Sequence, residues 1–442
     1  MNPENYSFVR EYNLKQITPM LHFQHAENGA CIRPSELKPK LDRFLLSKPV
    51  KRSDDNKIPK MWRNNGQEKA LNYKVFIQPE DSTAVSKSDT INRDIKLHEI
   101  SIRKGAKEEK EKEKFRIKNE YRYKGIDGLF FGNMVKSKES QYNALVRASY
   151  KETVFYEKPI KLKIVCHIPG LLEHIDNHID EFFAITNFGT RQNKGFGSFL
   201  IIRDFGLTDV NKKLRAGGYC YIRATIDGRS SITNEEGFKI ASAVYSVMKG
   251  GINFPSKDSK STGLYIKGYI QRQYLDDIGL NNIGSDKAFV KSDILTVAPK
   301  KRDSLRNIAE KPDDEPERSR SYTDYLYVRA LLGVADHVEY RDKDGLREGV
   351  VSISSDKVER FPSIITIKIT DEAVYFIISD PDKEIFGKDF EFSSDVKTGS
   401  IKTPDSFDKN RFKSDFITYF NSVRSRFENS KIYEMCTNVN LT

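Results

Sequence analysis

Apolar and polar residues follow a regular pattern through the first half of the chain. Four segments have the two-residue alternation or the short apolar run that is typical of strands. They are Phe8–Ile17, Tyr73–Gln78, Pro159–Ile168 and Ser198–Arg203. Two further segments, Ser35–Leu46 and Leu171–Phe188, have apolar residues three and four positions apart, which predicts amphipathic helices. This mixture of strands and helices predicts an α+β domain.

The second half mixes strands and helices in a similar way, although no letter-by-letter repeat is visible. Its predicted strands are Gly218–Ile226, Leu264–Ile270, Ile364–Ile369 and Ala373–Ile378, and its predicted helices are Glu235–Met248, Tyr322–Ala335 and Phe407–Phe427. A polar stretch at about 48–115, with prolines and a charge run, predicts an insertion in the first half. We therefore expect two α+β domains, at residues 1–207 and 208–442.

The composition adds a basic balance to this picture. The chain has 442 residues, and its 74 lysines and arginines against 63 acidic residues give a formal net charge of +11. This length leaves room for two or three domains of roughly 100–200 residues each. The charge surplus favours a polyanionic partner, such as nucleic acid, an acidic subunit or a membrane surface. A basic protein without such a partner stays an open alternative, because net charge governs attraction and not fold.

Membrane and metal partners are not expected. The N-terminal segment Met1–Arg10 is polar, unlike a signal peptide, and no apolar run reaches the roughly 18 residues of a membrane span. His174 and His178 are one helical turn apart, but Ile175 stands where a metalloprotease helix has a glutamate. The cysteines form no closely spaced pair, which argues against a zinc site and fits a reducing compartment; they are Cys31, Cys166, Cys220 and Cys436. We expect a cytoplasmic protein without a metal or other cofactor.

A glycine-rich loop is the strongest candidate for a binding site. It comprises Gly189, Thr190, Arg191, Gln192, Asn193, Lys194, Gly195, Phe196 and Gly197. Its glycines permit positive φ angles, and exposed amides in such a loop cradle phosphate oxygens. Arg191 and Lys194 would add charge beside those phosphates, while Phe196 would either stack on a base or fill the core. A purely structural turn stays open, and the loop matches neither the phosphate loop of NTPases nor the dinucleotide-binding fingerprint.

A second basic segment lies around the start of the first predicted helix. Its cationic residues are Arg33, Lys38, Lys40 and Arg43. Pro34 suits the first helical turn, and helix N-termini favour anions. The alternative is a solvated helix face that binds nothing.

Together these segments resemble the RAMP superfamily of CRISPR-associated proteins. In that family a loop with a glycine, several residues with Arg or Lys, and then Gly-Phe-Gly precedes the last strand of a ferredoxin-like domain, and Gly189–Gly197 has this form. The Arg-x-Ser-x-Leu-Lys-Gly-x-Leu-Arg segment of type III subunits is approached by Arg33–Arg43, with Pro39 in place of the glycine and Asp42 before the last arginine. Glu359–Ile364 is similar to an Arg-x-x-Ser-Pro strand entry of a Cmr subunit, with Ser and Pro reversed.

The resemblance implies two ferredoxin-like (RRM-like) domains with antiparallel sheets, plus loop and helical insertions. It further implies a subunit of a type III (Cmr-type) effector complex, and the length and two-domain layout are most like the first Cmr subunit. Such a subunit binds guide RNA towards its 3′ portion, or target RNA, and contacts the other subunits without catalysis. The residues of both basic segments, together with Arg360, are then the expected RNA contacts.

Two alternatives stay open. RAMP relatives that cut guide precursors often use a histidine near the N-terminus, so His22 or His25 would act as general base on a ribose 2′-OH in a guide-processing ribonuclease. Relatives that cut target RNA use an aspartate on a loop, but Asp42 falls within a helical pattern, so we predict no such role for it. The second alternative is a basic structural subunit that contacts only protein.

Overall fold

The chain forms two compact units. One comprises Met1–Tyr219, Thr233–Phe238 and Ile367–Asp371, and the other comprises Cys220–Ile232, Lys239–Thr366 and Glu372–Thr442. The computed structural model describes residues 8–20, 32–50, 58–64, 69–79, 85–87, 154–156, 158–204, 206–254, 264–295, 322–341, 347–358, 361–395, 397–429 and 433–442. The predicted boundary between residues 207 and 208 stays a prediction, and most of the predicted insertion at 48–115 lies outside the described residues.

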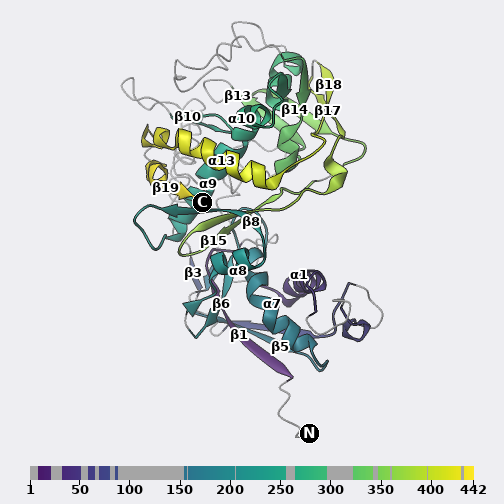
Figure 1. Cartoon of the computed structure of the whole chain (residues 1–442), viewed down its shortest axis with the longest axis vertical. Coiled ribbons are helices and arrows are strands. Elements are labelled where there is room, and N and C mark those ends of the chain that lie inside the picture. The colour runs from purple at the N-terminus through teal and green to yellow at the C-terminus, as the bar shows by residue number, and fades with distance from the viewer. Residues whose placement is uncertain are drawn as a thin grey trace, which may run out of the picture. The chain divides into compact units, whose positions relative to one another are not determined.

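The first unit is built on one antiparallel sheet, visible with its helices in Figure 1. Its main elements in chain order are β1 (Val9–Gln16), α1 (Pro34–Leu46), β2 (Lys74–Pro79), β5 (Ile160–Val165), α7 (Leu171–Ile185), β6 (Phe199–Arg203) and β7 (Gly206–Leu207). The strand order is β2-β5-β1-β6-β7, and each neighbouring pair is antiparallel. A β-α-β-β-α-β series with its first strand beside the third and fourth is the ferredoxin-like arrangement. The four strands and two helices named above for the first half are present among the described residues, although the helix predicted to reach Phe188 ends at Ile185.

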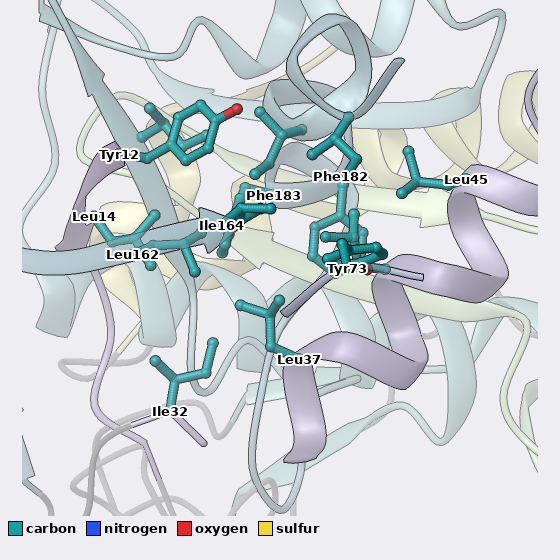
Figure 2. Packing of buried hydrophobic residues seen from close by; sticks show 14 of the residues in the cluster. Tyr12, Leu14, Ile32, Leu37, Leu45, Tyr73, Leu162, Ile164, Phe182 and Phe183 are labelled. Carbon is teal, nitrogen blue, oxygen red and sulfur yellow. The ribbon is translucent and has the colours of Figure 1, made fainter. Parts of the chain in front are cut away.

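The core of this unit lies between the sheet and its two long helices. In β5, Ile160, Leu162 and Ile164 are fully buried, while Lys161 and Lys163 between them are exposed. Figure 2 shows side chains of α1, such as Leu37 and Leu45, in the same cluster as Phe182 and Phe183 of α7. The alternation along the strand and the three-to-four spacing along the helices therefore direct the apolar residues to one shared core.

The second half of the chain contains another series of the same kind. Its elements are β8 (Cys220–Ile226), α9 (Asn234–Lys249), β15 (Ile365–Ile369), β16 (Val374–Ile378), α13 (Lys409–Val423) and β19 (Val439–Leu441). The strand order is β15-β16-β8-β19, which again places the first strand of the series between the third and the fourth. Both strands that flank β8 are antiparallel to it. The predicted α+β class with antiparallel ferredoxin-like sheets is thus confirmed.

The remaining elements are inserted into these two series. Those within the first series or between the two are β3 (Val85–Lys87), β4 (Val154–Tyr156) and α8 (Val210–Ala216). Those within the second series are β9 (Ile252–Phe254), β10 (Leu264–Ile266), α10 (Tyr269–Asp277), β11 (Ile283–Ser285), α11 (Asp286–Phe289), β12 (Asp324–Leu326), β13 (His337–Arg341), β14 (Arg347–Ser354), β17 (Asp389–Ser393) and β18 (Thr398–Lys402). Six of these strands form a separate sheet in the order β11-β12-β18-β17-β14-β13.

Two predictions for the second half were wrong in part. Tyr322–Ala335 is not one helix, because β12 pairs with β11 and β18 and a short 3-10 turn, Val328–Leu332, follows. The apolar residues of that turn are buried nearly all round, so their density indicated a core position and not helical amphipathicity. The strand predicted at Leu264–Ile270 ends at Ile266, where α10 soon begins.

Candidate nucleic-acid interface

The glycine-rich loop joins α7 to β6 and is closed at its base. Asn187 and Ser198 form an isolated antiparallel bridge, and the Phe188 amide donates to the Gly197 carbonyl at 2.9 Å. Inside the loop, Gly189, Gly195 and Gly197 have φ angles of 83°, 91° and 65°. Arg191 also has a positive φ, of 57°, which non-glycine residues seldom adopt. The predicted positive φ angles are therefore present, and the loop has a defined shape.

The Gly-Phe-Gly end of the loop packs inside the first unit. A Cβ atom on Gly197 would lie 1.9 Å from the Phe188 carbonyl oxygen, and one on Gly195 would lie 2.7 Å from the Ile369 Cδ1 atom. The Phe196 side chain is 1% exposed, and its ring centroid lies 4.8 Å from that of Phe238. Of the two roles predicted for Phe196, filling the core is the one that the structure has. These glycines allow close packing of the protein on itself.

Several loop amides already have acceptors within the protein. The amide of Gly189 donates to Glu36 Oε1 at 2.8 Å, and the amide of Gly197 donates to the Pro19 carbonyl at 2.9 Å. The amides of Lys194 and Gly195 donate to carbonyls within the loop. The predicted cradle of exposed amides is therefore not available to a phosphate at these four positions. Anion binding by the loop therefore has to use its side chains or the amides at its other positions.

Helix α1 is attached directly to this loop. The Lys40 ammonium donates to the Asn187 carbonyl at 3.0 Å and to Glu36 at 2.8 Å, and it also bonds the Gln192 side chain. The same ammonium lies 4.8 Å from the centroid of the Phe188 ring, a cation–π distance. The two segments predicted separately from the sequence thus lie together in the first unit. Lys40 and Glu36 of α1 both join them.

Lys38 is also held within the protein. Its ammonium donates to Asp42 at 2.7 Å and to the Leu71 carbonyl at 2.9 Å, and it lies 4.4 Å from the centroid of the Tyr73 ring. Asp42 is buried on the helix, which agrees with its position in a helical pattern. Burial, followed by the nearby carboxylate of Asp42, raises the pKa of Tyr73 well above its ordinary value. Lys38 therefore stabilises the fold around α1.

Four cationic side chains of the two segments reach the surface to different extents. Arg33, at the N-cap of α1, and Arg43, in its last turn, are exposed. Arg191 and Lys194 are half-buried, as are their loop neighbours Thr190, Gln192 and Asn193. Burial lowers the pKa of Arg191 to about 10. These four residues are the cations of the site with which a polyanion can make contact, and we call them the basic set.

The predicted strand Ile364–Ile369, which the sequence did not connect with the site, bonds both ends of the loop. Lys368 is fully buried, and its amine donates to the carbonyls of Thr186 at 2.9 Å and Phe199 at 3.2 Å, one on each side of the loop. The Asn187 side chain donates to the Ile367 carbonyl at 2.8 Å. Burial lowers the pKa of Lys368 well below its ordinary value. A lone lysine in an apolar strand carries no sequence signal for this role.

Other predicted residues lie apart from this site or cannot be placed. His22, His25, Cys31 and Arg360 lie outside the described residues. His174 is buried, with its Nε2 atom 3.3 Å from the Leu45 carbonyl oxygen, and burial lowers its pKa. Across the described ranges, no three His, Cys, Asp or Glu side chains gather as a metal site would require. None of the helices that the structure describes is long and apolar enough to cross a bilayer.

Two family models together match most of the chain. A model of the Cmr1 N-terminal domain matches residues 9–252, and a model of the Cmr1 C-terminal domain matches residues 265–438. The chain belongs to the Cmr1 family. It is therefore a subunit of the type III Cmr complex, as the resemblance to the RAMP superfamily predicted.

Other comparisons add little to the family assignment. The crystal structure of Cmr1 from Pyrococcus furiosus in its apo form aligns over 86% of this chain and 92% of that one, with 8% sequence identity and a TM-score of 0.35. No curated protein matches the chain in sequence.

Proposed function

We propose that the chain is a non-catalytic RNA-binding subunit of a type III (Cmr-like) effector complex. It holds the guide RNA towards its 3′ portion, the target RNA, or both, during antiviral defence in the cytoplasm. Membership of the Cmr1 family supports the place in the complex. The net charge of +11 supports a polyanionic ligand, because a basic surplus attracts nucleic acid without fixing its sequence.

The observation that carries the RNA-binding part is the attachment of the loop to α1. Glu36 accepts the Gly189 amide at 2.8 Å, and Lys40 bonds both Glu36 and the loop. The basic set is therefore carried on two elements that are held together by several hydrogen bonds. Cations on a preorganised element lose little freedom when they bind, so each phosphate contact is gained at a lower entropic cost.

The partly buried guanidinium of Arg191 favours an anion beside it. Its guanidinium is partly desolvated, and burial alone lowers its pKa to about 10. A phosphate beside it would raise that pKa again, because an opposite charge favours the charged form. Charge-assisted hydrogen bonds between arginine and phosphate are among the strongest in proteins. A half-buried arginine in an anchored loop is therefore well suited to hold an RNA backbone.

The proposal is tested by the salt dependence of RNA binding. The full chain and the double variant Arg191→Ala/Lys194→Ala are titrated with a labelled single-stranded RNA between about 50 and 200 mM salt. Each phosphate contact contributes about 0.7 to the slope of log K against log salt for a single strand. We expect the double variant to bind more weakly for every RNA sequence, with a slope smaller by about 1.4.

A matched control removes two charges elsewhere. Lys383 and Lys402 are both exposed and lie in the second unit. Their double replacement by alanine should change the slope much less than the loop variant does. Equal slopes for the wild type and the loop variant would remove the basis of the proposal. A wild-type chain without any salt-dependent RNA affinity would favour a subunit that contacts only protein.

A further inference from the structure

Strands β1, β2 and β5 of the first sheet have an outer face on the side opposite the core. At β6 this face is buried, because Leu200, opposite Lys15, is 1% exposed. Along β1, β2 and β5, side chains alternate between the two faces. Most of those directed away from the core are exposed, whereas Val9 and Val165 on the same face are half-buried. The exposed members of this face are Glu11, Asn13, Lys15, Lys74, Phe76, Gln78, Lys161 and Lys163. We call this set the open face. The helices α1 and α7 contribute to the core on the other side.

Strand register brings an aromatic ring beside lysines on the open face. Phe76 of β2 is opposite Lys163 of β5, and Gln78 is opposite Lys161. Side chains of directly opposed residues in an antiparallel pair lie on the same face, about 4.5–5.5 Å apart at Cβ. Lys74 lies two residues from Phe76 on the same strand. The ring is thus bordered by lysine across the ladder and along the strand.

Phe76 is unusually accessible for a phenylalanine within a strand. It is 51% exposed, and β2 is an edge strand of the sheet. A base that stacks on such a ring removes its apolar surface from water, and a nucleotide also has a phosphate for the neighbouring lysines. Four-stranded sheets of the RRM type bind single-stranded RNA through aromatic side chains on this kind of surface.

The charge of the open face also fits RNA. It carries four lysines and one glutamate among its eight members. Lys163 pairs with Glu11 at 3.7 Å, and Lys15 pairs with Asp371 at 3.7 Å, with all four side chains more than 40% exposed. Exposed pairs of this length are weak, so a phosphate can compete for these lysines. A protein partner would instead favour a contiguous apolar patch with few charges, and Phe76 is the one large apolar member of this set.

We propose that the open face is a second RNA-contact surface, on which Phe76 stacks a base of a single-stranded segment while Lys74 and Lys163 contact the adjoining phosphates. The proposal rests on the proposed function in taking RNA as the ligand. The open face contains no residue of the basic set. An experiment can therefore contradict the proposed role of the open face without contradicting that of the loop, and the reverse.

A tryptophan reporter tests the stacking directly. The chain has a single tryptophan, Trp62, which is buried, so Phe76→Trp places a second indole on the open face. We expect a twelve-residue oligouridylate to quench the added fluorescence of this variant of the full chain. The wild type, with Trp62 alone, supplies the background. Absence of added quenching at saturating RNA would overturn the stacking.

Affinity measurements supply a second readout. Phe76→Ala should weaken oligouridylate binding by about 5- to 150-fold, the range that loss of one stacked base produces. Phe76→Tyr should bind within about twofold of the wild type, because its ring stacks equally well. Lys163→Ala should reduce the salt slope by about 0.7, as loss of one phosphate contact does. Unchanged affinity in Phe76→Ala would contradict the proposal.

The loop variant separates this inference from the proposed function. Arg191→Ala/Lys194→Ala in the Phe76→Trp background should weaken binding and leave the quenching at saturation intact. Quenching without any effect of the loop variant would reject the loop and keep the open face. A weakened loop variant without quenching would reject the open face and keep the loop.

Discussion

Lys368 holds both ends of the glycine-rich loop, a role that its sequence context does not indicate. Its amine is fully buried and donates to carbonyls at both ends of the glycine-rich loop. Burying an amine in this way favours the neutral form, which agrees with the lowered pKa. The residue therefore fixes the separation of the loop ends through two hydrogen bonds.

This role predicts a pH-dependent stability. Below the ordinary lysine pKa of 10.5 the unfolded chain is protonated at this position, whereas the folded chain stays neutral down to its lowered pKa. The unfolded state then binds more protons, so this residue makes the free energy of unfolding rise with pH within that window. In Lys368→Met this contribution is absent. We expect the unfolding free energy of the wild type minus that of the variant to increase as the pH rises towards the ordinary lysine value of 10.5, by at most about 1.4 kcal/mol per pH unit.

The exposed Lys402 serves as the control, since Lys402→Met should follow the wild type at each pH. Urea titrations at several pH values supply the free energies. Parallel curves for the wild type and Lys368→Met would show that the lysine is not neutral when folded.

At the scale of the element, the loop is a rigid part of the first unit. Its Gly-Phe-Gly end is buried, and its base is closed by the pairing of Phe188 with Gly197. A loop of this kind presents Arg191 from a fixed backbone, in the left-handed conformation that has a φ of 57°. This rigidity gives the glycines a structural role, through which they would support the proposed RNA binding indirectly.

Two glycines with similar φ angles allow the contribution of this close packing to stability to be measured. Gly197 has a φ of 65° and Gly218 a φ of 68°, but only at Gly197 would a Cβ meet backbone, at 1.9 Å. Each change to alanine should cost roughly 1–2 kcal/mol for the left-handed conformation. We expect Gly197→Ala to cost clearly more than Gly218→Ala in urea unfolding, because Phe188 has to move. Equal costs would mean that the close approach is relieved without strain.

Local patterns were sufficient for the main elements but not for their tertiary partners. The alternation through Val9–Gln16 and the apolar spacing of Leu171–Ile185 predicted a strand and a helix that are present. Most insertion strands were missed. β3, β4, β9 and β11 have three residues each, so few positions carry the alternation, but β13, β14, β17 and β18 have five to eight residues and were missed despite their length. The loop was found from its glycines and cations, but Lys368 lies almost two hundred residues away and no local pattern connects the two.

At the scale of the whole molecule, two ferredoxin-like series and the Cmr1 family assignment agree with the resemblance seen in the sequence. In the second series, as in the first, the first strand lies between the third and the fourth. This order is kept although a long insertion separates α9 from β15. Antiparallel sheets with one open face leave surface for a ligand, and a basic surplus selects a polyanion for it. The proposed RNA contacts of the first unit, on the loop and on the open face, follow from this combination.

Crosslinking within the assembled complex tests the central claim most directly. The full chain is purified with its partner subunits and with guide or target RNA that contains 4-thiouridine, and the crosslinked peptides are sequenced. We predict crosslinks on the loop segment 189–194 or at the basic positions Arg33 and Arg43 of α1. Crosslinks to other subunits of the same complex, with none on these two segments of this chain, would contradict the account.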